Sequence, residues 1–204
     1  RDRSVSRGLG DVYKRQRMLR LINQLLEFRK MQNNKLALSL EETDVMAFLY
    51  EIFLSFNDAA ESKNMDFKFL PSVASYKMFI DKGYLDKVTY NLLSNAFKYT
   101  PSGGKVTFSV TVDEARKLLV ISVADSGVGI PKEKRNELFK RFMQSSFSGS
   151  SVGVGLHLTH ELVCVHKGTI VYTENEGGGS IFTVSLPTCL LYTSDAADDS
   201  LRVD

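Results

Sequence analysis

Two asparagines and a lysine recur at helical spacing between residues 91 and 98, where the sequence reads NLLSNAFK. Side chains at i, i+4 and i+7 lie on one face of an α-helix, so Asn91, Asn95 and Lys98 would point the same way. Carboxamide oxygens suit Mg²⁺, which keeps coordination positions for phosphate oxygens, and a nearby lysine can contact the same phosphates. The spacing is equally typical of a solvated polar helix face, so this segment alone leaves both interpretations open.

A second group of residues, DSGVGI at 125–130, follows an apolar stretch that is typical of a strand. Gly127 and Gly129 would let the backbone turn sharply and approach a flat ligand. A buried Asp125 could accept a hydrogen bond from the exocyclic amine of a base. An Asp-x-Gly sequence after a strand is also a common plain turn, so this segment is weak when taken alone.

A third segment, GSSVGVGL at 149–156, opens a predicted helix. Unpaired N–H groups at a helix start, with glycines before them, form an anion site that suits phosphate. The segment is not a Walker loop, because no G-x-x-x-x-G-K-[ST] occurs, and neither glycine segment satisfies G-x-G-x-x-G. We therefore expect any phosphate to be held by a different kind of fold.

The elements that must position these residues follow from the periodicity of the apolar side chains. Period-two alternation predicts strands over 67–70, 76–80, 105–112, 117–124, 169–173 and 180–186. Helical spacing and capping residues predict helices over 18–31, from Asp44 to about 63, from Asp81 to the turn at 101–104, over 131–139 and over 154–166. Because these elements alternate without regular βαβ spacing, we expect an α+β two-layer sandwich. Its mixed, mostly antiparallel sheet would be covered on one face by helices.

The composition narrows the class of protein. The 204 residues are 43% hydrophobic and 25% charged, with a formal net charge of +2, which is typical of a globular domain and does not favour attraction to nucleic acid. The two cysteines, Cys164 and Cys189, show no CxxC spacing, which excludes a disulfide-rich scaffold and a structural zinc module. No run reaches the roughly 20 apolar residues of a membrane span. We expect any sensor or membrane part to lie outside this chain.

Taken together, and in this order along the chain, the three segments are no longer weak evidence for a nucleotide site. Together with LFKRF at 138–142, they resemble the asparagine box, the first glycine box, the phenylalanine box and the second glycine box of sensor histidine kinase ATP-binding domains. The resemblance covers about residues 17–187. The sequence over this range is similar to those of hybrid two-component sensor kinases of Bacteroidetes. It implies the Bergerat-type ATP-binding fold shared by gyrase, heat-shock chaperones, histidine kinases and mismatch-repair ATPases.

The resemblance also implies a role for each matching residue. Asn95 would ligate Mg²⁺, and Asn91 would support the metal and the phosphates of ATP. Lys98 would contact phosphate and Tyr99 would pack at the nucleotide. These residues would position Mg·ATP for phosphoryl transfer.

The remaining boxes would bind the adenine and form the lid over the nucleotide. Asp125 would accept the adenine amino group, and Gly127 and Gly129 would make room for the ring. The other expected contacts come from a phosphate-binding arginine, two lid-anchoring phenylalanines and the first residues of the helix at the end of the lid: Arg141, Phe139, Phe142, Gly153, Val154, Gly155 and Leu156.

Two alternatives compete with a kinase. Hydrolysing ATPases of the same superfamily place a Glu four residues before the metal-binding Asn, as general base for the attacking water. Here that position is Asn91, and a carboxamide cannot take the proton, so transfer is favoured over hydrolysis. The other alternative is a degenerate nucleotide-binding module that regulates a partner.

The histidines do not fit the role of phosphoryl acceptor. His157, His160 and His166 all lie in or at the end of the helix after the second glycine box, not on a dimerisation helix. We expect the first two on the helix surface, His166 at the helix C-terminus and Cys164 in the core.

The expected domain organisation follows from the resemblance. Residues 1–16 and 188–204 resemble translated adaptor sequence and are interpreted as non-native tails, with native disordered tails as the alternative. Residues 17–38 would be the end of a dimerisation helix and its linker, and 39–187 the ATP-binding domain. We expect a cytoplasmic domain of a membrane-anchored, homodimeric sensor. Its partners would be ATP, the phosphoacceptor domain of the same protein and a receiver domain, with no direct nucleic-acid contact.

Overall fold

Alternating apolar side chains along the central strands bury one face of a five-stranded sheet. The computed structural model describes residues 37–139 and 155–189. The strands lie in the order β2 (Asp66–Pro71), β4 (Lys105–Asp113), β5 (Leu118–Asp125), β7 (Ser180–Pro187) and β6 (Thr169–Glu174). β2 pairs with β4 in parallel, and the other three pairings of this sheet are antiparallel.

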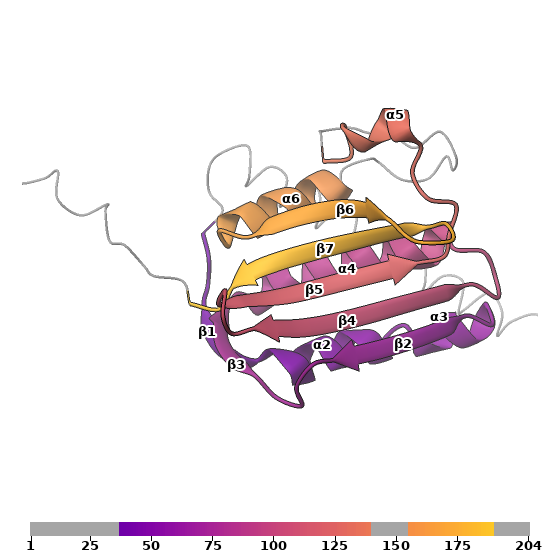
Figure 1. The fold of residues 1–204 in the computed structure, drawn as a ribbon. Helices are drawn as coiled ribbons and strands as arrows, with labels where there is room; N and C mark the ends of the chain where they lie inside the picture. The colour runs from indigo at the N-terminus through magenta and orange to yellow at the C-terminus, as the bar shows by residue number, and fades with distance from the viewer. Residues whose placement is uncertain (1–36, 140–154, 190–204) are drawn as a thin grey trace, which may run out of the picture.

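The helices cover the buried face of this sheet (Figure 1). They are α2 (Val45–Leu54), α3 (Asn57–Ser62), α4 (Lys82–Tyr99) and α6 (Gly155–Val165), while the short α5 (Lys132–Arg135) stands apart at one edge. The core between the two layers holds fully buried side chains from both, such as Phe108 and Ile121 of the sheet and Leu92 of α4. The structure confirms the predicted two-layer α+β fold with a mixed, mostly antiparallel sheet.

The predicted helix caps are also confirmed. The Asp44 carboxylate accepts hydrogen bonds from the first-turn amides of α2, at 3.1 Å from Met46 N and 3.3 Å from Ala47 N. The Asp81 carboxylate accepts from Tyr84 N at 2.9 Å and so caps α4. Its second oxygen accepts from Ser39 N at 2.8 Å, which fixes the segment before β1 (Glu41–Asp44) to the start of the helix that carries the asparagines.

Three predictions about secondary structure and burial were wrong. The helix expected from Asp44 to about 63 is divided into α2 and α3, because the Ser55 hydroxyl bonds to Ile52 O at 2.6 Å and competes with the helical hydrogen bonds. The helix expected over 131–139 is reduced to α5, none of whose residues is buried. Cys164 is exposed rather than in the core.

Other features were missed or cannot be compared. β1 pairs with β3 (Lys77–Ile80) in a separate two-stranded sheet that the acidic sequence EETD does not suggest. The predicted helix at 18–31 and the Ser/Gly-rich lid at 144–151 lie outside the described residues. Within 37–139 and 155–189, no helix is long and apolar enough to cross a membrane.

His166 follows the last turn of α6 and is almost fully buried, with 3% of its surface exposed. Its Nδ1 donates to Leu162 O at 2.8 Å, and no hydrogen-bond partner for Nε2 exists among the described residues. Burial lowers the pKa of His166 below its ordinary value of 6.5, and this effect outweighs the opposing influence of the Leu162 carbonyl and the Asp81 charge. Burial therefore keeps the ring mostly neutral at pH 7.

Lowering the pH below about 6.5 should destabilise the protein through His166. The folded-state pKa lies below the unfolded value, so between the two values the unfolded chain binds the extra proton. The free energy of unfolding then falls with decreasing pH, by at most ~1.4 kcal/mol per pH unit for one proton. Denaturant unfolding across a pH series should give a steeper fall for the wild type than for His166→Gln, and equal slopes would contradict this assignment.

Candidate functional site

Four segments that are far apart in the sequence meet at one end of the sheet. They are the C-terminal end of α4, the end of β5, the turn between β6 and β7, and the beginning of α6 (Figure 1). The antiparallel order β5–β7–β6 produces this meeting, since β5 ends where β7 begins. The topology thus brings together the asparagine segment, the first glycine segment and Gly155–Leu156, the described end of the second.

The asparagine face of α4 lies at the edge of the buried layer. Asn91 and Asn95 are half-buried and Lys98 is exposed, whereas Leu92 and Leu93 on the other side of the helix are buried. This confirms the expected division of the helix into a polar and an apolar face. Lys98 Nζ lies 3.2 Å from the Tyr99 hydroxyl, which places the ammonium beside the ring.

The two asparagines differ in their contacts. Asn91 Nδ2 donates to Thr159 Oγ1 of α6 at 2.8 Å. The Asn95 side chain has no hydrogen-bond partner among the residues that the structure describes. The oxygens of both carboxamides are therefore available to a ligand or a metal.

Asp125 ends β5 with a carboxylate that is 5% exposed. Its Oδ1 accepts two backbone hydrogen bonds, from Gly127 N at 2.8 Å and from Ser180 N at 3.2 Å. No donor within the described part of the chain is assigned to Oδ2, which leaves this oxygen to a ligand. Burial raises the pKa of Asp125 above its ordinary value of 3.8, and the two backbone hydrogen bonds oppose the rise.

The glycines permit close backbone approach around this carboxylate. A Cβ on Gly127 would lie 2.5 Å from Tyr99 O, so the loop after β5 can rest on the end of α4 only without a side chain there. Gly129 has φ +66° and lies against Gly179, whose own Cβ would stand 1.9 Å from Asp125 O. Asn175 Nδ2 donates to that same Asp125 O at 2.8 Å.

The beginning of α6 also lies against the asparagine face. A Cβ on Gly155 would stand 2.6 Å from Asn91 Oδ1, so the first turn of the helix and this carboxamide are in direct contact. Leu156 packs partly buried against the core. The other expected site residues of this region, Arg141, Phe142, Gly153 and Val154, lie outside the described residues.

The predicted lid anchor Phe139 lies against α6. Its carbonyl oxygen is 2.9 Å from His157 Nδ1, and its ring centroid is 5.7 Å from that of His160. Both histidines are half-buried on the helix and contact this phenylalanine. These contacts hold both imidazole rings against Phe139 of the same domain.

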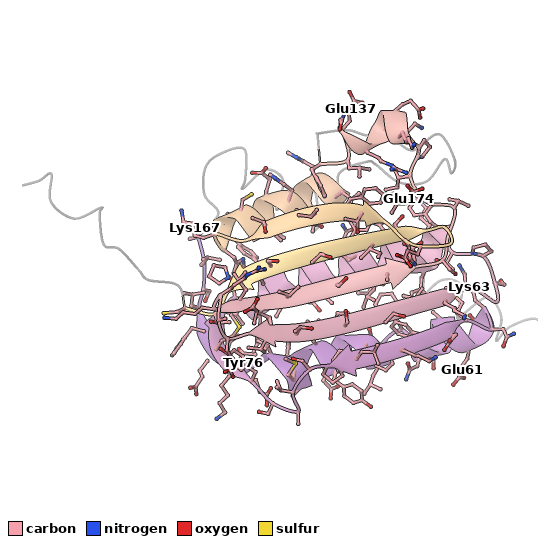
Figure 2. All side chains as sticks on the ribbon, in the orientation of Figure 1. Glu61, Lys63, Tyr76, Glu137, Lys167 and Glu174 are labelled. Carbon is pink, nitrogen blue, oxygen red and sulfur yellow. The ribbon has the colours of Figure 1, made fainter. Side chains whose placement is uncertain are left out.

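Several residues that complete the site could not be found from the sequence. Ser180 and Asn175 act through contacts with Asp125 across 55 and 50 residues, and Thr159 reaches Asn91 across 68. Arg135 of α5 binds Ile130 O at 2.9 Å and Glu174 at 3.0 Å, which joins the segment after the glycine loop to the end of β6. Figure 2 shows Glu174 at that end of the strand, below α5.

The donor set fits Mg²⁺ that arrives with a phosphate ligand. No group of three or more His, Cys, Asp or Glu side chains that could hold a metal occurs in 37–139 or 155–189. The available donors are the carboxamide oxygens of Asn91 and Asn95, which are hard ligands and too few for a dedicated cage. Mg²⁺ commonly uses one or two protein ligands and completes its shell with phosphate oxygens and water.

The comparison with known sequences agrees with this arrangement. Residues 80–189 match the family described as histidine kinase-, DNA gyrase B-, and HSP90-like ATPase. The chain is 36% identical over 197 residues to histidine kinase P4 of Formosa agariphila, covering 89% of this chain and 14% of that protein. It is 35% identical over 188 residues to the sensor histidine kinase WalK of Bacillus subtilis, covering 90% of this chain and 30% of that protein. The chain thus spans less than a third of either relative.

Solved structures show the same fold. Full-length ShkA in complex with AMPPNP superposes with a TM-score of 0.73 at 24% identity, covering 84% of this chain and 36% of that one. Histidine kinase ThkA in complex with the response regulator TrrA gives a TM-score of 0.69 at 19% identity, covering 93% of this chain and 53% of that one. The likeness to Bacteroidetes kinases that the sequence suggested is supported by the Formosa relative. The chain therefore belongs to the histidine kinase-, DNA gyrase B- and HSP90-like ATPase family, and within it is similar to the catalytic domains of sensor histidine kinases.

Proposed function

We propose that this chain supplies the ATP-binding catalytic domain of a two-component sensor histidine kinase. In the full-length protein it would bind Mg·ATP and position the γ-phosphoryl group for transfer to a histidine elsewhere. The observation that carries the proposal is that the helix with Asn91 and Asn95 ends against the loop that follows the buried Asp125, where Val128 N donates to Tyr99 O at 3.4 Å.

Adenine would be recognised by Asp125. Because Oδ1 is occupied by Gly127 N and Ser180 N, Oδ2 would accept the hydrogen bond from the exocyclic amine. Gly127 and Gly129 would leave room for the ring, and Tyr99 would pack beside the nucleotide. A buried acceptor that no donor in 37–139 or 155–189 satisfies gives a strong preference for a base that presents a donor.

The phosphates would lie between α4 and the beginning of α6. Asn95 and Asn91 would hold Mg²⁺ through their carboxamide oxygens, and Lys98 would contact a phosphate. Mg²⁺, when bound, neutralises charge on the transferring phosphoryl group. The backbone N–H groups around Gly153, Val154, Gly155 and Leu156 and the guanidinium of Arg141 would contribute further phosphate contacts. The chain's own residues would thus position the nucleotide and neutralise its charge, and these two effects are most of phosphoryl-transfer catalysis.

The acceptor histidine would come from another part of the full-length protein. The three histidines of this chain lie on or directly after α6, where His157 and His160 contact Phe139 and His166 is buried. We infer a homodimeric sensor in which residues 17–38 join the dimerisation domain to an ATP-binding domain at 39–187. Residues 1–16 and 188–204 would be non-native tails. A receiver domain would accept the phosphoryl group next, as the complex of ThkA with TrrA suggests, and a membrane anchor would lie outside this chain.

Removal of the Asn95 carboxamide should abolish the gain in ATP affinity that Mg²⁺ provides, because one of few protein ligands is lost. Isothermal titration of Asn95→Ala with ATP, in Mg²⁺ and in EDTA, should give the same weak affinity in both. Asn57→Ala, which removes the same side chain from α3, should keep the response to Mg²⁺. An Asn95→Ala protein that still responds like the wild type would refute the metal assignment.

Asp125→Asn should weaken binding of ADP selectively. The amide oxygen can still accept from Gly127 N and Ser180 N, so the NH₂ group would replace Oδ2 and face the adenine amine, donor against donor. The loss should be roughly 1–3 kcal/mol for ADP and small for GDP. Equal losses for both nucleotides would show that Asp125 only stabilises the loop after β5 and does not recognise the base.

The same carboxylate should give ADP binding a pH dependence. Protonation would place the proton on Oδ2, because Oδ1 accepts the two amides, and would turn the acceptor into a donor. The wild-type affinity for ADP should therefore fall as the pH decreases through the raised pKa of Asp125, while Asp125→Asn shows no such fall. A wild-type affinity that stays constant down to pH 3.8, the ordinary pKa of the carboxyl, would contradict this.

The chain by itself should not form acid-labile phosphohistidine. Incubation with ATP labelled on the γ-phosphate should leave it unlabelled and produce little free phosphate, since Asn91 cannot act as the hydrolytic base. A separately expressed dimerisation domain with its acceptor histidine should become labelled when added. Label on this chain alone that disappears in His160→Asn would overturn the assignment of His160 as a bystander.

A further inference from the structure

A threonine that belongs to none of the sequence boxes connects two of them. Thr159 lies on the second turn of α6 and is 1% exposed. Its Oγ1 is 2.8 Å from Asn91 Nδ2 on α4 and 2.9 Å from Gly155 O on its own helix. One hydroxyl therefore joins the metal-binding helix to the first turn of the helix at the end of the lid.

Counting donors determines how this hydroxyl is used. A threonine hydroxyl carries one proton and two acceptor lone pairs. Gly155 O can only accept, so the proton of Thr159 is committed to that carbonyl. The remaining contact requires a donor from Asn91, which must present its NH₂ group to Thr159. The orientation of a carboxamide is ordinarily ambiguous from shape alone, and here the hydrogen-bond chain decides it.

The opposite side of the Asn91 carboxamide is thereby also fixed. Its Oδ1 faces Gly155, where a Cβ would stand only 2.6 Å away. Because position 155 is glycine, it adds no side chain over this oxygen at the beginning of α6, which the proposed function places beside the phosphates. An amide rotated by 180° would put its NH₂ group there and would lose the bond to Thr159.

We propose that Thr159 is a positioning residue that locks the Asn91 carboxamide with its oxygen toward Mg²⁺ and the phosphates. This inference rests on the proposed ATP-binding function. Valine at position 159 would preserve the packing but would leave the amide free to turn its donor face to the ligand. Serine would preserve the lock with one methyl group fewer.

The test compares Thr159→Val and Thr159→Ser with a matched control. Thr89 on α4 is also fully buried, and its Oγ1 has no hydrogen-bond partner among the described residues, so Thr89→Val removes a hydroxyl without removing a lock. Partners that orient metal ligands typically contribute 10- to 100-fold to metal affinity. Mg·ATP affinity should fall by roughly that factor in Thr159→Val. It should stay near the wild-type value in Thr159→Ser and Thr89→Val, and adenosine affinity without metal should be unchanged in all three.

A nuclear magnetic resonance measurement reads the lock without any nucleotide. The side-chain amide signals of Asn91 are the pair that disappears in Asn91→Asp. In the wild type, Thr159→Ser and Thr89→Val, they should be shifted and protected from solvent exchange, and Thr159→Val should lose both properties.

The possible outcomes distinguish failure of the Thr159 role from failure of the proposed ATP-binding function. Wild-type protein that fails to bind Mg·ATP would overturn the proposed function and the role of Thr159 with it. Where the wild type binds, undiminished Mg·ATP affinity in Thr159→Val would refute the positioning role alone. A Thr159→Ser protein as weak as Thr159→Val would do the same. Asn91 amide signals that are identical in the wild type and Thr159→Val would show that no lock exists.

Discussion

The site depends on how closely two backbone segments approach the Asp125 carboxylate and the main-chain carbonyl of the same residue. A Cβ on Gly127 would collide with the end of α4, and one on Gly179 would stand 1.9 Å from Asp125 O. Because both positions lack a Cβ, the loop after β5 and the turn before β7 can enclose Asp125, of whose surface only 5% is exposed. Burial costs free energy and raises the pKa of Asp125, and two backbone amides offset part of that cost. The same enclosure leaves one oxygen facing outward, which a ligand can use.

The local part of this arrangement could be predicted from the sequence. Asn91, Asn95 and Lys98 share a helix face because the 3.6-residue period requires it, and Asp44 and Asp81 cap helices because their carboxylates can reach first-turn amides. Apart from β1, the strands followed from period-two alternation, and the turns at 101–104 and 177–179 followed from their glycines. In each case the determining contacts join residues a few positions apart, so the sequence pattern contains them.

Contacts over long separations could not be predicted in this way. Ser180, Asn175 and Thr159 complete the site from 50 to 68 residues away, and a lone serine, asparagine or threonine has no pattern that marks it. β1 exists because its backbone pairs with β3 and Asp81 holds Ser39, although its side chains are mostly acidic and exposed. The break at Ser55 depends on which of two competing hydrogen bonds the hydroxyl makes. These features are decided by tertiary contacts rather than by local preference.

The bond between Thr159 and Asn91 also bears on the choice between transfer and hydrolysis. A glutamate at position 91, as in the hydrolysing branch of the superfamily, would offer only acceptor oxygens to a hydroxyl whose proton is committed to Gly155 O. Either the hydroxyl would turn from that carbonyl to the glutamate, or two acceptors would face each other at a buried position, and the second case would cost roughly 1–3 kcal/mol. Asn91 and Thr159 are therefore complementary as a pair. The carboxamide at position 91 satisfies Thr159 without displacing its hydroxyl from Gly155 O, which a carboxylate could not do.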